Sequence, residues 1–329
     1  MERLFNEFEK LTRIASPSGH ERALLEYIKK ECEPYCDSVY FDKRGNLVCR
    51  KKNEGAKKLL LAAHADELGI LAMYAEEEGN YRFSVFGGVN LPSLLYRRVN
   101  FTNGVVGVIV PDDGTSLSDL KLANLSVDIG AKSKKQAEKL LAPLTVGVSD
   151  SPAVKLGSRF VSRAIDDKVG CLILLELIRS VKSSKFDLYF CFTVEEELGL
   201  RGAKTVGFEI EPDIAIAIDV SSATDMIPIK RNGITLGGGA AIKVLDVGTV
   251  CDKELNAELI SVAKKAKRRY QLDVADRGCT DAAALQFVKG GVKATVVSVA
   301  TRYIHTPNEQ ADLNDVSDVI AVIKGYIEG

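Results

Sequence analysis

Four short, mostly apolar runs constrain the fold more than any other feature of this sequence. A continuous apolar run of this kind is typical of a strand that is buried on both faces of a parallel sheet. Stretches with the apolar spacing of helices separate the runs. Strands that alternate with helices predict an α/β fold, a mostly parallel sheet covered by helices on both faces. The runs are Leu59–Ala63, Phe186–Val194, Ile214–Val220 and Lys293–Ala300.

A change of pattern near residue 68 predicts an insertion into this α/β fold. From there to about residue 152, short β-like runs alternate with turn residues, and only the segment 132–141 has a helical pattern. Closely spaced short strands are typical of a mainly β unit. We therefore expect one α/β domain, residues 1–68 plus 153–329, which is interrupted by a β-rich domain at residues 69–152. The length of 329 residues fits one large domain with an insertion.

The first fifty residues predict two helices and a strand pair. Apolar residues recur at helical spacing between Leu4 and Ile14. Ser18 and Glu21 have the spacing of a capping box, so we expect a second helix to begin there. The strands at 38–41 and 47–50 are joined by a segment whose glycine and asparagine suit a tight turn.

Composition excludes several classes of protein. Lys and Arg total 44 against 45 Asp and Glu, so the chain lacks the basic excess of a nucleic-acid-binding protein. The basic run at 264–269 is interpreted as a solvated helix face, with a nucleic-acid patch as the minor alternative. No apolar run reaches the roughly 18 residues of a membrane span, and the N-terminus lacks a signal-peptide core. Seven scattered cysteines argue against a disulfide framework. We expect a cytoplasmic protein with no membrane partner.

Polar residues that suit metal binding follow the predicted strands. Ligands of open α/β sheets bind beyond the carboxyl ends of the strands, so these residues are expected to share one pocket. One further acidic pair precedes the helix predicted to start near residue 168. The residues are His64, Asp66 and Glu67; Asp166 and Asp167; Glu195, Glu196 and Glu197; Asp219; and His305.

A metal centre explains this collection better than separate structural roles do. Each feature has a plain alternative: a structural histidine, a solvated acidic loop, acids at a helix N-terminus, or an aspartate that caps a turn. Carboxylates that lie together resist ionisation unless a cation compensates them. Histidine with Asp and Glu suits zinc or cobalt, and two such ions roughly 3.5–4 Å apart can activate a water. The residues alone leave open which of the three consecutive glutamates takes part.

Eight segments in order along the chain resemble the tetrahedral aminopeptidase family. Its members are also known as glutamyl or deblocking aminopeptidases, and as cellulase M or endoglucanase M. Each motif is weak alone, but the ordered set is specific. The segments are PSGHE (17–21), DKRGNL (42–47), HADELG (64–69), AIDDKVG (164–170), TVEEELGLRGA (193–203), IDVSSATD (218–225), CTDAAA (279–284) and YIHTPNE (303–309).

The resemblance implies two divalent metal ions per chain, zinc or cobalt. His64 and Asp219 would bind one ion, and Glu197 and His305 would bind the second. Asp166 would bridge the two. The resemblance also implies that the inserted domain serves dimerisation, so we expect a homodimer or a larger homo-oligomer of up to twelve chains.

The resemblance further implies the removal of N-terminal residues from peptides. Glu196 would be the general base toward a water between the two ions, and would pass the proton to the leaving amine. Asp66 would accept the other ring proton of His64 and orient that ligand.

Three other functions remain alternatives. A related metal-dependent deacylase or carboxypeptidase would share the same ligands with a different pocket. A glycosidase would need only a carboxylate pair and no metal. A non-catalytic binding scaffold would not need Glu196 beside a complete ligand set. A nucleophilic pair of Cys279 and His305 would leave the acidic cluster unexplained.

Overall fold

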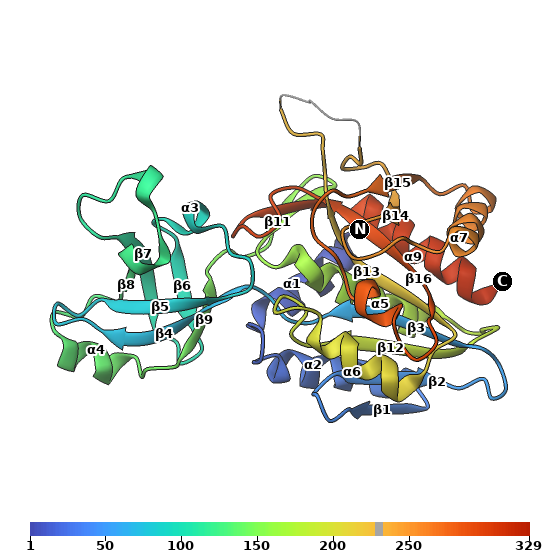
Figure 1. Ribbon diagram of the computed structural model, residues 1–329, viewed down its shortest axis with the longest axis horizontal. Coiled ribbons are helices and arrows are strands. Elements are labelled where there is room, and N and C mark those ends of the chain that lie inside the picture. The colour runs from blue at the N-terminus through green and yellow to red at the C-terminus, as the bar shows by residue number, and fades with distance from the viewer. Residues whose placement is uncertain (228–232) are drawn as a thin grey trace.

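An eight-stranded sheet carries the larger part of the molecule, and a separate barrel lies beside it (Figure 1). The computed structural model describes residues 1–227 and 233–329. In spatial order, the strands of the large sheet are β1 (Ser38–Phe41), β2 (Leu47–Lys51), β12 (Asp187–Thr193), β3 (Lys58–His64), β13 (Ile214–Ser222), β16 (Lys293–Thr301), β14 (Ala240–Leu245) and β15 (Tyr270–Val274).

The centre of this sheet is parallel and formed by the four predicted strands. β12 pairs with β3, β3 with β13, and β13 with β16, all in the parallel sense. The sheet is mixed toward its edges, because β2 is antiparallel to β12 and β14 is antiparallel to β16. The parallel register sets Thr193 opposite His64, so the carboxyl ends of β12 and β3 meet at one edge. The predicted α/β fold with a mostly parallel sheet is confirmed; β14 and β15 were not predicted.

Helices cover both faces of the sheet, because the central strands carry apolar residues on both faces. Leu59 and Leu61 of β3 face one core, and Leu60 and Ala62 face the other. None of the helices in the described ranges combines the length and hydropathy that a bilayer crossing requires. The first face is covered by α1 (Glu2–Arg13), α2 (Arg22–Cys32), α5 (Ile165–Ser180), α7 (Lys253–Lys265) and α9 (Leu313–Glu328), and the second by α6 (Arg201–Ile210) and α8 (Ala282–Leu285).

The inserted unit is a closed antiparallel barrel with its own apolar core. Closure leaves no free strand edge around the barrel. The predicted helix at 132–141 is present as α4 (Lys134–Leu140), and a short α3 (Leu91–Leu94) lies between two strands. In spatial order, the barrel strands are β4 (Gly69–Ala75), β5 (Tyr81–Phe86), β8 (Leu125–Asp128), β7 (Val106–Pro111), β6 (Arg98–Phe101) and β9 (Val146–Ser149).

A small three-stranded sheet connects the barrel's exit to the C-terminal part of the chain. β11 pairs with the neighbours β10 and β17, and Ser162 lies opposite Glu309. This pairing brings the start of α5 close to the segment that follows β16. The strands are β10 (Val154–Leu156), β11 (Arg159–Ser162) and β17 (Glu309–Asp312); the 3₁₀ turns are η1 (Glu33–Tyr35), η2 (Leu117–Asp119) and η3 (Leu122–Asn124).

The capping box predicted at the start of the second helix is wrong. Glu21 occupies the cap position without a side-chain cap. The Ser18 hydroxyl instead donates to a carboxylate oxygen of Asp66 at 2.7 Å. The Glu21 carboxylate accepts from the backbone N–H groups of Gly19 at 2.7 Å and Glu195 at 3.1 Å. Asp66 and Glu195, both distant in sequence, thus take part in place of the local Ser18–Glu21 pairing that the motif predicted.

A buried ion cluster ties three distant segments together beside the end of β3. Glu67 is 2% exposed and accepts from the Lys168 ammonium at 2.6 Å and from the Arg163 guanidinium. The backbone N–H of Ser16 also donates to Glu67, at 2.9 Å. Lys168 donates further to the carbonyl of Ile14 at 2.7 Å. The cluster therefore holds the segment after α1, the end of β3 and the first turn of α5 in one arrangement.

Replacing Glu67 by glutamine should destabilise the protein strongly. Two cations would then be buried without a counter-charge, which costs on the order of 3–5 kcal/mol. Urea unfolding followed by circular dichroism measures the effect. Glu26→Gln is the matched control, because the Arg22–Glu26 pair is exposed and such pairs contribute about 0–1 kcal/mol. Equal midpoints for the two variants would contradict the role assigned to the cluster.

Candidate metal centre

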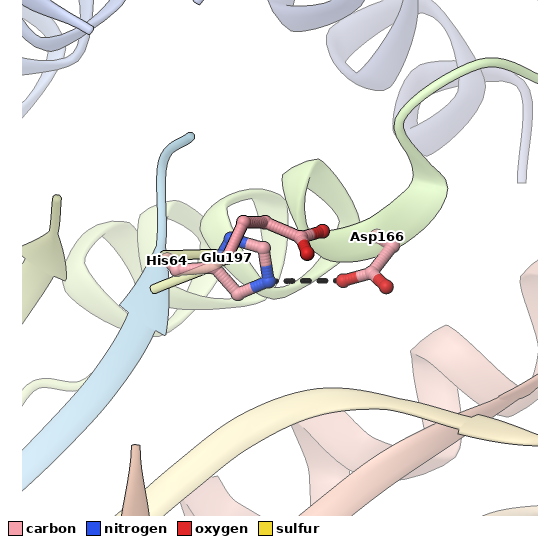
Figure 2. A group of neighbouring side chains, drawn as sticks. All are labelled: His64, Asp166 and Glu197. Carbon is pink, nitrogen blue, oxygen red and sulfur yellow. Dashed lines mark hydrogen bonds and ion pairs between the residues drawn. The ribbon is translucent and has the colours of Figure 1, made fainter. Parts of the chain in front are cut away.

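Asp166 lies between two histidines that come from distant parts of the chain. Its Oδ1 is 2.9 Å from Nε2 of His64, and its Oδ2 is 3.5 Å from Nε2 of His305. His64 ends β3 and Asp166 belongs to the first turn of α5, as Figure 2 shows. Glu197 lies above the His64 ring in the same view, and its Oε2 is 3.4 Å from Nε2 of His305. Donor atoms of His64, Asp166 and Glu197 all lie within 4.8 Å of one another.

A second group of donors shares His64 and extends to Asp219. Donor atoms of His64, Asp167 and Asp219 also lie within 4.8 Å of one another, and all three side chains are buried. Asp167 accepts from the backbone N–H of His64 at 3.2 Å and of Gly170 at 3.0 Å. A side chain at position 170 would collide with this carboxylate, since a Cβ would lie 2.3 Å from one of its oxygens. The two groups together include four of the five predicted ligands. The fifth, His305, contacts Asp166 and Glu197 of the first group.

The Asp66 carboxylate lies behind the donors and organises two of the loops that carry them. It is fully buried, and Nδ1 of His64 lies 3.1 Å from the backbone carbonyl oxygen of Asp66 and 3.5 Å from the carboxylate Oδ1. Its oxygens accept from the backbone N–H groups of Glu196 at 2.9 Å and Glu197 at 3.2 Å. Ser18 adds the hydroxyl hydrogen bond described above. Asp66 therefore fixes the end of β3 and the turn after β12 relative to each other.

The three consecutive glutamates after β12 have different surroundings. Glu195 has a positive φ of 53° and turns outward, where its carboxylate pairs with Arg44 at 2.5 Å and Arg201 at 3.1 Å. Glu197 points to His305. Glu196 lies close enough to His64 and Asp219 for their charges to act on it. Geometry thus separates Glu195 from the other two, a choice that the residue pattern alone left open.

Two residues that were not predicted, Glu309 and Gly88, hold His305 and Asp166 in place. Glu309 is buried, and its oxygens accept from the backbone N–H of Asp166 at 3.0 Å and of His305 at 2.9 Å. The Nδ1 of His305 is 3.0 Å from the carbonyl oxygen of Gly88, in the segment after barrel strand β5. A Cβ at residue 88 would lie 3.2 Å from that same nitrogen. Glu309 was visible in the motif YIHTPNE, but nothing local marked Gly88.

The electrostatics of this cluster call for a cation. Burial, reinforced by the charge of Asp166, raises the pKa of Asp219 to about 8. Burial also raises the pKa of Glu196, and the nearby Asp219 adds to the effect. Although burial opposes it, hydrogen bonding to His305 and His64 lowers the pKa of Asp166. Carboxylates this crowded are stable as anions beside a metal ion, and imidazole nitrogens with carboxylate oxygens are the donors that zinc-like ions prefer. The residues present therefore fit divalent metals.

A pocket that is partly open to solvent lies against the metal-binding groups. Asp166, Glu197 and His305 line one side of it. Three other ionisable residues line it: Glu309, and the pair Glu67 and Arg163, which are bound to each other. The rest of the wall is mainly apolar and comes from the start of the barrel and the segments around α3, namely Leu68, Ile70, Val89, Leu94 and Val99.

Two residues within the segments that carry the resemblance, His20 and Cys279, lie outside the arrangement of donor groups. The ring of His20 packs edge-on against Phe86, with centroids 6.0 Å apart. Cys279 lies at the surface, and desolvation together with nearby carboxylates raises the pKa of its thiol. A nucleophilic cysteine needs the opposite shift, so the Cys279–His305 alternative is not supported.

Related proteins share this architecture over nearly their whole length. The lysyl aminopeptidase of Pyrococcus furiosus is 30% identical, with 97% of this chain and 95% of the relative covered. An aminopeptidase of the archaeon Desulfurococcus kamchatkensis superposes with a TM-score of 0.96 at 34% identity, covering 99% of this chain and 95% of that one.

A third relative is described in terms of its assembly. The TET1 peptidase of Pyrococcus horikoshii, which can assemble into a tetrahedron or a large octahedral shell, superposes with a TM-score of 0.89 at 31% identity. The match covers 98% of this chain and 99% of the relative. Residues 45–322 match the sequence pattern of the family described as M42 glutamyl aminopeptidase. This chain therefore belongs to the M42 glutamyl aminopeptidase family.

Proposed function

We propose that this metal-dependent aminopeptidase works with two divalent ions, zinc or cobalt, held by His64, Asp219, Glu197 and His305 with Asp166 between them. The observation that carries the proposal is the position of Asp166, which contacts both histidines through different oxygens. Asp166 belongs to one donor group, and the second donor group shares His64 with the first. A carboxylate that presents one oxygen to each side suits a bridge between two ions.

In this proposal Glu196 is the general base and Asp66 positions the ligands. Bound divalent ions would polarise the scissile carbonyl and make a water more acidic. Glu196 takes the proton from that water and returns it to the leaving amine. Burial and neighbouring acids raise the pKa of Glu196, which suits a group that must both accept and donate a proton. Asp66 contacts both the His64 ring and the backbone N–H of Glu196, so it fixes the position of the base relative to this ligand.

The cavity beside the metal-binding groups is proposed to receive an apolar side chain of the substrate's N-terminal residue. Its wall offers no unpaired cation for an acidic side chain, because Arg163 is bound to Glu67. A charged side chain would lose its hydration against Leu68, Ile70 and Val99 without a partner.

The assembly and location are further parts of the proposal. Residues 1–68 plus 153–329 would form the catalytic domain, and residues 69–152 would form a dimerisation domain. The closed barrel and the shells described for the Pyrococcus horikoshii relative support a homodimer or a larger homo-oligomer of up to twelve chains. Peptides would be the substrates, with no nucleic-acid or membrane partner, and the cytoplasm is the proposed location.

Glu196→Gln should abolish most turnover and leave the metal content unchanged. Loss of a general base lowers the rate by roughly 10²–10⁴-fold. Hydrolysis of an aminoacyl p-nitroanilide gives the rate, and elemental analysis gives the metal content. Glu195→Gln is the matched control and should stay near the wild-type rate, because Glu195 faces Arg44 and Arg201. Full activity of the Glu196 variant would refute the assignment of the base.

His305→Ala should bind one metal ion fewer than the wild-type protein. The variant removes the donor that contacts both Glu197 and Asp166, and leaves His64 untouched. Elemental analysis after dialysis measures the ratio of metal to protein. His20→Ala serves as the control and should retain both ions, since its ring contacts Phe86. Equal metal content in the two variants would rule out His305 as a ligand.

Leucyl p-nitroanilide should be cleaved faster than the glutamyl and lysyl analogues. The expected ratio in kcat/KM is on the order of 100-fold, because the charged side chains would be desolvated without a partner. Leu94→Lys adds a cation to the pocket wall, so it should reduce the ratio of kcat/KM between the leucyl and the glutamyl substrate. A preference of the wild-type protein for a charged substrate would contradict the proposed pocket.

A further inference from the structure

Asp281 is a buried residue whose carboxylate does not cap the helix that it precedes. It comes directly before the short helix α8, but its side chain makes no capping hydrogen bond. One carboxylate oxygen accepts from the Thr193 hydroxyl at 2.5 Å. The other is buried and has no hydrogen-bond partner within residues 1–227 and 233–329. Because a buried carboxylate with an unpaired oxygen costs stability, its presence points to a role in the site rather than in the fold.

The partner of Asp281 lies where the sheet meets the metal centre. Thr193 is the last residue of β12, is fully buried, and lies opposite His64 in the parallel register. Its carbonyl accepts from the backbone N–H of Ala65, the residue after His64, at 2.9 Å. Thr193 therefore connects the strand end that carries His64 to the carboxylate of Asp281.

The turn that follows Thr193 needs anchors of this kind. Glu195 in this turn has a φ of 53°, a left-handed conformation that a residue with a side chain keeps only where its surroundings hold it. Before Glu195, the N–H of Val194 donates to the side-chain oxygen of Asn46 at 3.0 Å. After it, Asp66 accepts from the two backbone N–H groups described above. The hydrogen bond from the Thr193 hydroxyl is the third anchor, and it ties the turn to the C-terminal part of the chain.

We propose that Asp281 is a positioning residue of the peptidase site. Through the Thr193 hydroxyl it fixes the end of β12 beside His64. The turn that continues from there carries Glu196 and Glu197, so their places depend on the same hydrogen bond. The inference rests on the proposed function, in which Glu196 is the base and Glu197 and His64 bind metal.

A direct role in the reaction does not fit Asp281. Neither donor group of the metal centre includes it, and neither it nor Thr193 lines the pocket beside these groups. Asp281 is 3% exposed, so a substrate does not reach it. It acts through Thr193, and loss of the contact should change metal binding and turnover without changing how the substrate's side chain is held.

Thr193→Val tests the contact with a small change. Valine has the shape of threonine but no hydroxyl, so Asp281 loses its hydrogen bond. The dissociation constant for zinc, measured by competition between the full-length protein and a chromophoric chelator, should rise about 10-fold or more. With leucyl p-nitroanilide, kcat should fall by a similar factor and KM should change less than about twofold, because Thr193 lies outside the pocket.

Two further variants show whether the hydrogen bond carries the effect. Thr193→Ser keeps the hydroxyl, so it should restore both the dissociation constant and kcat. Asp281→Ala should reproduce the defect of Thr193→Val. The double variant should be no worse than Asp281→Ala alone, because the two side chains act through one contact.

Thr295→Val is the matched control. Thr295 is a buried threonine near the start of β16, and its hydroxyl donates to the side chain of Asn256 at 2.5 Å. Its replacement should lower the thermal midpoint, as Thr193→Val does, and leave the dissociation constant and kcat unchanged. An equal loss of zinc affinity in this control would mean that destabilisation alone causes the effect, which contradicts the proposal.

The zinc titration separates failure of this inference from failure of the proposed function. Unchanged zinc binding by Thr193→Val, where the wild-type protein binds two ions, would overturn the role of Asp281 and leave the proposed function standing. A defect in Thr193→Ser as large as in Thr193→Val would overturn that role too. If the wild-type protein binds no zinc, the proposed function itself fails and the inference falls with it.

Discussion

The position of Asp166 between two histidines is the constraint on which the candidate site depends. His64 and His305 are 241 residues apart in the sequence, and both reach the same carboxylate. The parallel sheet places His64 at the end of β3. The pairing of β11 with β17 brings Asp166 and His305 close together. Glu309 accepts from the backbone of both Asp166 and His305, so a single buried side chain sets the spacing of that half of the site.

The inserted barrel also takes part in the site. The carbonyl of Gly88 meets the ring nitrogen of His305 that faces away from Asp166, which fixes the orientation of the ring. The apolar wall of the adjoining cavity comes largely from the same region of the barrel. A change in the position of the barrel would therefore alter both a proposed ligand and the proposed substrate pocket.

The sequence predicted the features that follow from local pattern, and missed those that depend on distant partners. Apolar runs identified the central strands, and the residues after them identified the donor groups. Only the fold reveals that Glu195 forms an ion pair with Arg44, away from the donor groups, and that Ser18 donates to Asp66 instead of capping a helix. The basic run at 264–269, interpreted from the sequence as a helix face, is helical only as far as Lys265, and the chain then enters the edge strand β15.

Anomalous X-ray diffraction from crystals grown with zinc tests the central claim most directly. We expect two peaks separated by roughly 3.5–4 Å on either side of Asp166, one beside His64 and Asp219 and the other beside Glu197 and His305. A single peak, or a second peak away from Glu197 and His305, would contradict it.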